Sequence, residues 1–156
     1  ANRGKSNRIK IAVLLVKMAD RISEEARSYV MSRVGSKNTK PEIIVRSFLH
    51  KRGFRFRLHK KELPGKPDLV LNKYKSVIFV NGCFWHRHKD CPRATMPTSN
   101  IEFWKKKFRA TQNRDRLIRQ ELENLGLVVI TIWECELKSP IREKTLKGVE
   151  EKIYQV

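Results

Sequence analysis

The sequence predicts an α/β fold in a single domain, with a mixed central β-sheet flanked by helices. The chain has 156 residues, of which 40% are hydrophobic, and this is enough to bury one core. Segments of helical spacing precede, separate and follow the strand-like runs in the middle of the chain. These runs are residues 54–58, 69–71, 77–80 and 127–133. No internal repeat or low-complexity segment divides the pattern.

The first seventeen residues are expected to form a flexible basic extension ahead of a domain of residues 18–156. They carry five lysines and arginines and no acidic residue. Their apolar run, residues 11–16, is too short to span a bilayer of about 30 Å, and no small-residue cleavage pattern follows it. A basic arm that contacts phosphates is the alternative interpretation of this segment.

Two helices are expected before the first strand. Ser23 and the two acidic residues after it open a short helix that ends near Val34, because turn-forming residues follow. Thr39 is the N-cap candidate of the next helix, and Gly53 stops it. Glu42 would then lie in the first turn of that second helix.

The remaining elements follow from periodicity. The continuous apolar runs 77–80 and 127–133 predict fully buried strands. A polar stretch over residues 101–125 has helical spacing and stops at Gly126, and a final amphipathic helix is expected over residues 141–154.

The charge balance predicts a polyanionic partner. The 35 lysines and arginines outnumber the 16 acidic residues and give a formal net charge of +19. Such an excess favours nucleic acid, because neutralising phosphates drives both binding and encounter. A basic protein that binds anions without specificity is the alternative. Lys105, Lys106, Lys107 and Arg109 are either phosphate contacts or a solvated helix face.

The cysteines predict a zinc site. Three cysteines cannot all pair into disulfides, and their closeness to histidines indicates metal binding in a reducing compartment, so a cytoplasmic protein is expected. The predicted Cys₃His ligand set is Cys83, His88, Cys91 and Cys135. Two alternatives stay open: His86 replaces His88, or Cys135 is a small core residue and the other thiols are free.

Asp68 is the candidate for a catalytic carboxylate. It precedes the strand-like run 69–71, where a rigid backbone could hold a hard oxygen ligand for Mg²⁺, the ion that phosphodiester hydrolysis needs. The alternative is an Asp that only hydrogen-bonds the backbone of a Gly-Pro turn. A histidine near Asp68 that binds no zinc, which would be His86, could act as a general base.

Five segments in unbroken order carry a resemblance to a known family. They are Pro-Gly-Lys-Pro-Asp at residues 64–68, Val-Asn-Gly-Cys-Phe-Trp-His at 80–86, Glu-Phe-Trp at 102–104, Asn-Arg-Asp at 113–115 and Trp-Glu-Cys at 133–135. Together they resemble the very-short-patch repair (Vsr) DNA mismatch endonucleases, whose fold is restriction-endonuclease-like. The similarity runs from about residue 31 to residue 137.

The resemblance implies an enzyme that nicks double-stranded DNA on the 5′ side of the thymine in a T:G mismatch, the lesion left when 5-methylcytosine deaminates. Asp68 corresponds to the metal-binding aspartate of the family, and His86 to its proposed general base. Glu42 corresponds to an acidic residue near the metal and its waters. Val80 would bind Mg²⁺ through its backbone carbonyl, and the four predicted zinc ligands fall on the structural zinc ligands of the family.

The resemblance also implies an aromatic wedge at the mismatch. Phe84, Trp85 and Trp104 occupy the positions of the inserted rings, and Met31, followed by Val34, lies in a segment that contacts the minor groove and joins the wedge. An inserted ring replaces lost stacking, and unstacking costs least at a mispair. Core packing is the alternative role for these side chains.

Two departures from the family concern the metal site. Asn81 stands where relatives tend to carry His or Asp, and Val80 replaces a residue that is Thr in some of them. An amide can ligate through oxygen but carries no charge, so Asn81 could weaken the catalytic centre. A zinc-stabilised DNA-binding module with weak or absent nuclease activity is therefore one alternative, and a restriction or homing-type nuclease on the same fold is another.

The resemblance leaves several properties open. A monomer is expected, because an asymmetric lesion requires no twofold symmetry, and partners from a repair pathway are implied only by the family. The flanking bases around the mismatch are not encoded in a recognisable way, because base readout depends on a few groove contacts.

Overall fold

The computed structural model describes Tyr29 and residues 37–155. The predicted extension, the predicted helix ending near Val34 and the predicted wedge residue Met31 lie outside the described residues. The elements are α3 (Lys40–Lys51), β1 (Arg57–Leu58), β2 (Leu69–Leu71), the 3₁₀ turn η1 (Asn72–Tyr74), β3 (Ser76–Asn81), α4 (Ile101–Asn124), β4 (Val128–Trp133) and α5 (Arg142–Tyr154).

The sheet is mixed, as predicted. Its strand order is β1-β2-β3-β4, in which β1 and β3 both run antiparallel to β2, while β3 and β4 are parallel. The parallel pair requires a crossover, and α4 lies in that connection. Six residues of β3 pair with six of β4, so these two strands form the longest ladder.

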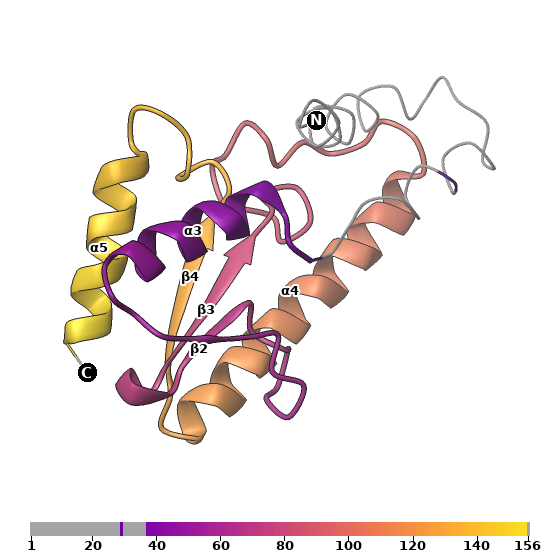
Figure 1. Cartoon of the computed structure of the whole chain (residues 1–156). Coiled ribbons are helices and arrows are strands. Elements are labelled where there is room, and N and C mark those ends of the chain that lie inside the picture. The colour runs from indigo at the N-terminus through magenta and orange to yellow at the C-terminus, as the bar shows by residue number, and fades with distance from the viewer. Residues whose placement is uncertain (1–28, 30–36, 156) are drawn as a thin grey trace.

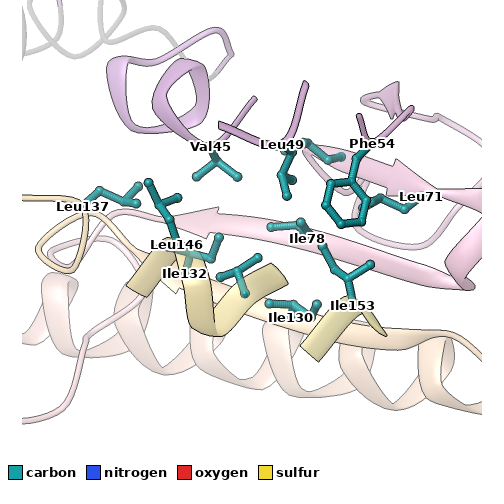
Figure 2. Close-up of a cluster of buried hydrophobic side chains, with 12 residues drawn as sticks. Val45, Leu49, Phe54, Leu71, Ile78, Ile130, Ile132, Leu137, Leu146 and Ile153 are labelled. Carbon is teal, nitrogen blue, oxygen red and sulfur yellow. The ribbon is translucent and has the colours of Figure 1, made fainter. Parts of the chain in front are cut away.

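Helices cover both faces of the sheet, which confirms the predicted arrangement. Figure 1 shows α3 and α5 on one face and α4 across the other. Strand side chains alternate between the two faces. Ile78, Ile130 and Ile132 point into the main cluster with residues of α3 and α5, whereas Val77 meets Leu122 of α4 on the opposite face. The main cluster is drawn in Figure 2.

Two strand predictions are corrected. The predicted strand 54–58 contributes only Arg57–Leu58 to the sheet, because Phe54 leaves the ladder to pack against Tyr74 and Tyr154 in the core. The run 127–133 is not fully buried: Val128 is exposed, and Ile130 and Ile132 are the buried residues of β4. Ile130 and Ile132 pack in the main cluster, and Val129 is half-buried against the cluster on the α4 side, whereas Val128 at the start of the strand is covered by neither.

The prediction of a fully buried strand at residues 77–80 is also corrected, and the half-burial of the second part of β3 has another cause. Ser76, Val77 and Ile78 are buried, but the last three residues of the strand are only half-buried. β2 pairs with the first three residues of β3, and its first residue, Leu69, lies opposite Ile78, so β3 continues beyond its neighbour. The projecting end of β3 borders the cleft that holds the candidate active site.

The three helix predictions that fall on described residues hold to within a few residues. Thr39 is the N-cap of α3, and its backbone N–H and hydroxyl both donate to Oε1 of Glu42, at 3.2 and 2.8 Å. α4 ends at Asn124, two residues before Gly126, which has a left-handed φ of 74°. None of the described helices is long and apolar enough to cross a membrane.

Candidate active site and metal centre

Asp68 lies at the N-terminal end of β2, beside the projecting end of β3. The backbone N–H of Val80 donates to Asp68 Oδ2 at 2.8 Å. In a strand, the N–H and C=O of one residue point to the same side, so the carbonyl of Val80 also faces Asp68. Burial raises the pKa of the Asp68 carboxyl above its ordinary value, and the hydrogen bond from Val80 opposes this effect.

The surrounding cleft brings most of the predicted catalytic residues together. Its volume is about 1080 Å³. The predicted residues that line it are Glu42, Asp68, Val80, Asn81, Trp85 and His86. His59 and Asp115 are among the other titratable side chains that line the same cleft. These residues come from α3, the loop before β2, β3, the turn after β3 and α4, so the cleft depends on the whole fold.

Glu42 is buried, and both of its oxygens already accept hydrogen bonds. Oε1 takes the two capping bonds from Thr39, while Oε2 accepts from the backbone N–H of Asn38 at 3.0 Å and from Arg46 at 2.7 Å. Arg46 also donates to the side chain of Asn38 at 2.6 Å. Glu42 is therefore close to Asp68, as the resemblance implied, but it is engaged in organising the start of α3 and the position of Arg46.

His59 is a residue of the cleft that sequence reasoning missed. Its ring lies between Glu42 and Asp68. One ligand atom can be chosen from each of these three side chains so that all three atoms lie within 4.8 Å of one another. Its backbone φ is 46°, in the left-handed region that few residues other than Gly adopt. No sequence pattern indicated His59, because it directly follows a predicted strand and belongs to no spaced motif.

Asp115 is the second residue that was missed as a site component. It projects from α4, and its Oδ2 lies 2.5 Å from Nδ1 of His86. A neutral imidazole that donates through Nδ1–H keeps Nε2 as its acceptor. The segment 113–115 was part of the family resemblance, but nothing in the sequence indicated that Asp115 meets His86, 29 residues away.

The donor set around Asp68 suits a hard divalent cation. A carboxylate and a backbone carbonyl are oxygen ligands of the kind that Mg²⁺ prefers. Oδ2 of Asp68 is held by Val80, while Oδ1 lies 3.7 Å from His59 Nδ1, beyond hydrogen-bond distance. Asp68 can therefore offer an oxygen to an ion without losing its backbone contact. Asn81 lines the cleft next to Val80 and adds an uncharged amide.

The four predicted zinc ligands converge at the ends of β3 and β4. Asn81 and Trp133 are paired in the parallel ladder, and Cys83 and Cys135 each follow two residues later. The short loop after Cys83 then returns His88 and Cys91 to the same point, so that the four ligand atoms lie within 4.8 Å of one another.

The distances in this cluster fit a tetrahedral site. With bond lengths near 2.3 Å to sulfur and 2.0 Å to nitrogen, neighbouring sulfur and nitrogen ligands are about 3.5 Å apart. Nδ1 of His88 lies 3.6 Å from Cys83 Sγ and 3.3 Å from Cys135 Sγ. The ring of His88 stacks on Trp133 at 4.2 Å, whereas His86 faces Asp115, so the geometry favours His88 as the ligand.

Burial affects the thiols of this cluster. It raises the pKa of Cys83 and of Cys135 above the ordinary value for a thiol. Without a cation these sulfurs stay protonated, and a bound metal would stabilise their thiolate forms.

The predicted wedge rings differ in exposure. Phe84 and Trp104 are only 8% and 6% exposed, because they pack with Phe108 in a small aromatic cluster. Trp85 is half-buried against that cluster and lines the cleft. Phe103, which was not predicted as a site residue, is 59% exposed, and Lys107 Nζ lies within 5.3 to 5.7 Å of the rings of Trp85, Phe103 and Trp104.

Comparisons with known proteins agree on one family. The family model described as DNA mismatch endonuclease Vsr matches residues 19–93. The type II nicking enzyme V.NmeAIP of Neisseria meningitidis is 48% identical over 122 residues, which cover 78% of this chain and 86% of that protein. The type II nicking enzyme V.XorIIP of Xanthomonas oryzae is 48% identical over 120 residues, covering 77% and 88%. The DNA mismatch endonuclease Vsr of Escherichia coli is 39% identical over 127 residues, covering 81% and 80%.

Proposed function

Because the chain belongs to the Vsr family of DNA mismatch endonucleases, we propose that it makes a Mg²⁺-dependent single-strand nick on the 5′ side of the thymine in a T:G mismatch. Membership makes the chain a DNA endonuclease. The mismatch, the strand that is cut and the metal are the proposed part.

One observation carries the proposal: Asp68, whose Oδ2 accepts a hydrogen bond from the backbone N–H of Val80, lies in the same cleft as His86, which is paired with Asp115. A phosphodiester hydrolase needs an oxygen-ligand anchor for its metal and a base for water within reach of one phosphate. The cleft supplies both from different elements. Mg²⁺, when bound, would stabilise the charge that develops on the phosphate and make water a stronger nucleophile.

His86 is the proposed general base. Asp115 accepts from Nδ1–H, which orients the ring and leaves Nε2 to take a proton from the attacking water. The negative charge of Asp115 would also stabilise the imidazolium that results. The backbone N–H of His86 donates to the carbonyl of Gly82 at 3.1 Å, so the turn after β3 fixes its position.

The zinc cluster is proposed to be structural and to hold this turn in place. Cys83 and His88 flank His86 in the sequence, and both converge with Cys135 beyond the end of β4. A closed Cys₃His site leaves no open position for substrate, which is the feature of structural zinc. The metal would therefore act on catalysis through the position of His86.

Mismatched duplex DNA is the proposed substrate. The net charge of +19 favours binding to phosphates, and the half-buried Trp85 borders the catalytic cleft, where it can enter a weakly stacked step. A T:G pair would be selected because it costs less to unstack than a Watson–Crick pair. The relatives include one protein named for mismatch cleavage and several named as nicking enzymes.

A second candidate function follows from Asn81. This uncharged residue lines the cleft beside Val80, where a carboxylate or imidazole would bind a cation more strongly. The second candidate is a zinc-stabilised protein of this family that binds mismatched DNA and cleaves it weakly or not at all.

A nicking assay tests both candidates. End-labelled duplexes that differ only in a T:G or T:A pair, with varied flanking bases, are incubated with the protein and Mg²⁺, and an Asp68→Ala variant serves as the matched control. A cut 5′ to the mismatched thymine that needs Mg²⁺ and Asp68 supports the proposal. Binding to T:G duplexes without any cut, in every flanking context, favours the second candidate, and equal cutting of T:A duplexes contradicts mismatch specificity.

A further inference from the structure

We propose that His59 is a positioning residue that directs an Nδ1–H group at Oδ1 of Asp68, and that it is not itself a ligand of the catalytic metal. This inference rests on the proposed function of Asp68 as the anchor of that metal. It assigns a role to a side chain that no motif of the sequence indicated.

Arg46 determines which nitrogen of His59 carries the proton. Its Nη2 lies 3.0 Å from His59 Nε2 and 2.7 Å from Glu42 Oε2, so one terminal nitrogen with two hydrogens serves both neighbours. Arginine only donates hydrogen bonds, and Nε2 must therefore be the acceptor. In a neutral imidazole the remaining proton then resides on Nδ1, the nitrogen that faces Asp68.

The distance from His59 to Asp68 fits an orienting contact. Nδ1 of His59 is 3.7 Å from Oδ1 of Asp68, and both side chains are mostly buried, at 16% and 17% exposure. A shift of less than about 1 Å would form a hydrogen bond, and contacts of this kind commonly tighten when the substrate complex forms. The backbone N–H of Val80 holds the other oxygen, Oδ2. Asp68 would thus be fixed from two sides, which sets the direction of the lone pairs left for a cation.

The competing interpretation makes Glu42, His59 and Asp68 a three-ligand metal site, since their ligand atoms lie within 4.8 Å of one another. Arg46 argues against it in two ways. Its guanidinium occupies the space between Glu42 and His59 and would repel a cation there. It also places the proton of His59 on Nδ1, and a protonated nitrogen has no lone pair to offer. Glu42, for its part, already accepts bonds at both oxygens.

The backbone of His59 supports a functional role. His59 follows the two-residue strand β1 directly and adopts a φ of 46°. Residues other than Gly in this conformation are strained, and such strain is often found at functional sites. The conformation brings the ring into the cleft instead of continuing the alternation of β1.

A matched pair of variants tests the proposal. His59→Asn and His59→Asp have side chains of almost the same shape, and both tolerate a left-handed backbone. Asn offers an N–H donor close to the position of Nδ1, whereas Asp offers only acceptors at neutral pH. His59→Gly relieves the backbone without a donor, and His50→Ala, on the exposed face of α3, controls for loss of a histidine.

The expected result is a graded loss of nicking at saturating substrate. His59→Gly and His59→Asp should lower kcat by about 10- to 100-fold, and His59→Asn should recover most of that loss. The Mg²⁺ affinity of the DNA-free protein, measured by titration calorimetry, should fall in His59→Gly and be largely recovered in His59→Asn. Nitrogen NMR of the metal-free wild-type protein should find the His59 proton on Nδ1, and Arg46→Met should release that preference.

Two results would overturn the proposal. Equal activity of His59→Gly and His59→Asn would show that no N–H donor at this position is used, and a proton on Nε2 instead of Nδ1 in the wild-type protein would remove the donor that the proposal requires. Failure of the proposed function has a different signature, because the wild-type protein would then bind T:G duplexes without cutting them, and failure of the premise about Asp68 would leave nicking by Asp68→Ala intact. If Asp68→Ala is inactive while His59→Gly cleaves like the wild-type protein, only the role of His59 is wrong.

Discussion

Asn81 and Trp133 are paired at the matching ends of the parallel strands β3 and β4, and this register links the two candidate metal sites. Cys83 follows Asn81 and Cys135 follows Trp133 at the same spacing, so the ladder delivers both thiols to one point. The backbone N–H of Glu134 donates to the carbonyl of Asn81 at 3.0 Å and extends the pairing beyond the strands. Gly82 and Glu134, just before these cysteines, border the cleft, so distortion of the candidate zinc site would reach the candidate catalytic residues.

The first prediction concerns zinc. Purified protein should contain one zinc ion per chain, and His88→Ala should lose it, because Nδ1 of His88 lies among the thiols. His86→Ala is the matched control and should keep the metal, since His86 is paired with Asp115. Elemental analysis of the three proteins measures this. Zinc retained in His88→Ala and lost in His86→Ala would reverse the assignment of the two histidines.

The second prediction concerns Asp68. Asp68→Asn should abolish nicking while leaving binding to T:G duplexes nearly unchanged, because the amide keeps the shape but loses the negative charge that anchors Mg²⁺. Since burial raises the pKa of Asp68, its ionised form is less favourable in the folded protein than in the unfolded one. The metal-free Asn variant should therefore unfold at a slightly higher temperature, as calorimetry would measure. Undiminished nicking by this variant would exclude Asp68 from the catalytic centre.

The third prediction separates His86 from Asp115. His86→Ala should lower kcat by about 10² to 10⁴-fold, the usual contribution of a general base. Asp115→Asn should also lower kcat, because an amide can hold the ring with the proton on the wrong nitrogen. Single-turnover nicking rates at several Mg²⁺ concentrations would measure both effects. A normal rate in Asp115→Asn would show that the short contact with His86 is not used in catalysis.

The sequence predictions succeeded where the signal lies within a few residues and failed where a feature depends on residues far apart in the sequence. Helix α3 was predicted nearly to its ends, because Thr39, Glu42 and Gly53 are local signals that act within a few residues. The exposure of Val128 and the short β1 were missed, because both depend on where a strand lies in the sheet. The same reason applies to the site. Asp68 and three of the four predicted zinc ligands, Cys83, His88 and Cys91, belong to compact motifs. The contacts of His59 with Arg46 and of Asp115 with His86 exist only after distant elements pack.

The last prediction distinguishes the aromatic rings by their burial. Trp104 is 6% exposed and packs against Phe84 and Phe108, so Trp104→Ala should destabilise the fold by about 3–5 kcal/mol, as large core truncations do. Trp85 is half-buried at the cleft, and Trp85→Ala should cost less stability but reduce the preference for T:G over T:A duplexes.

Denaturant unfolding and competition binding with the two duplexes would measure the effects on stability and on preference. Phe103 lies next to Trp104 on α4 but is exposed. Phe103→Ala is therefore the control for loss of an exposed ring, and it should leave the stability of the fold nearly unchanged. If Trp85→Ala weakens binding to T:G and T:A duplexes by the same factor, Trp85 acts in general DNA binding or in packing. Another side chain must then select the mismatch. If instead it lowers the preference while Trp104→Ala acts on stability alone, the wedge consists of Trp85 supported from behind by a buried aromatic cluster.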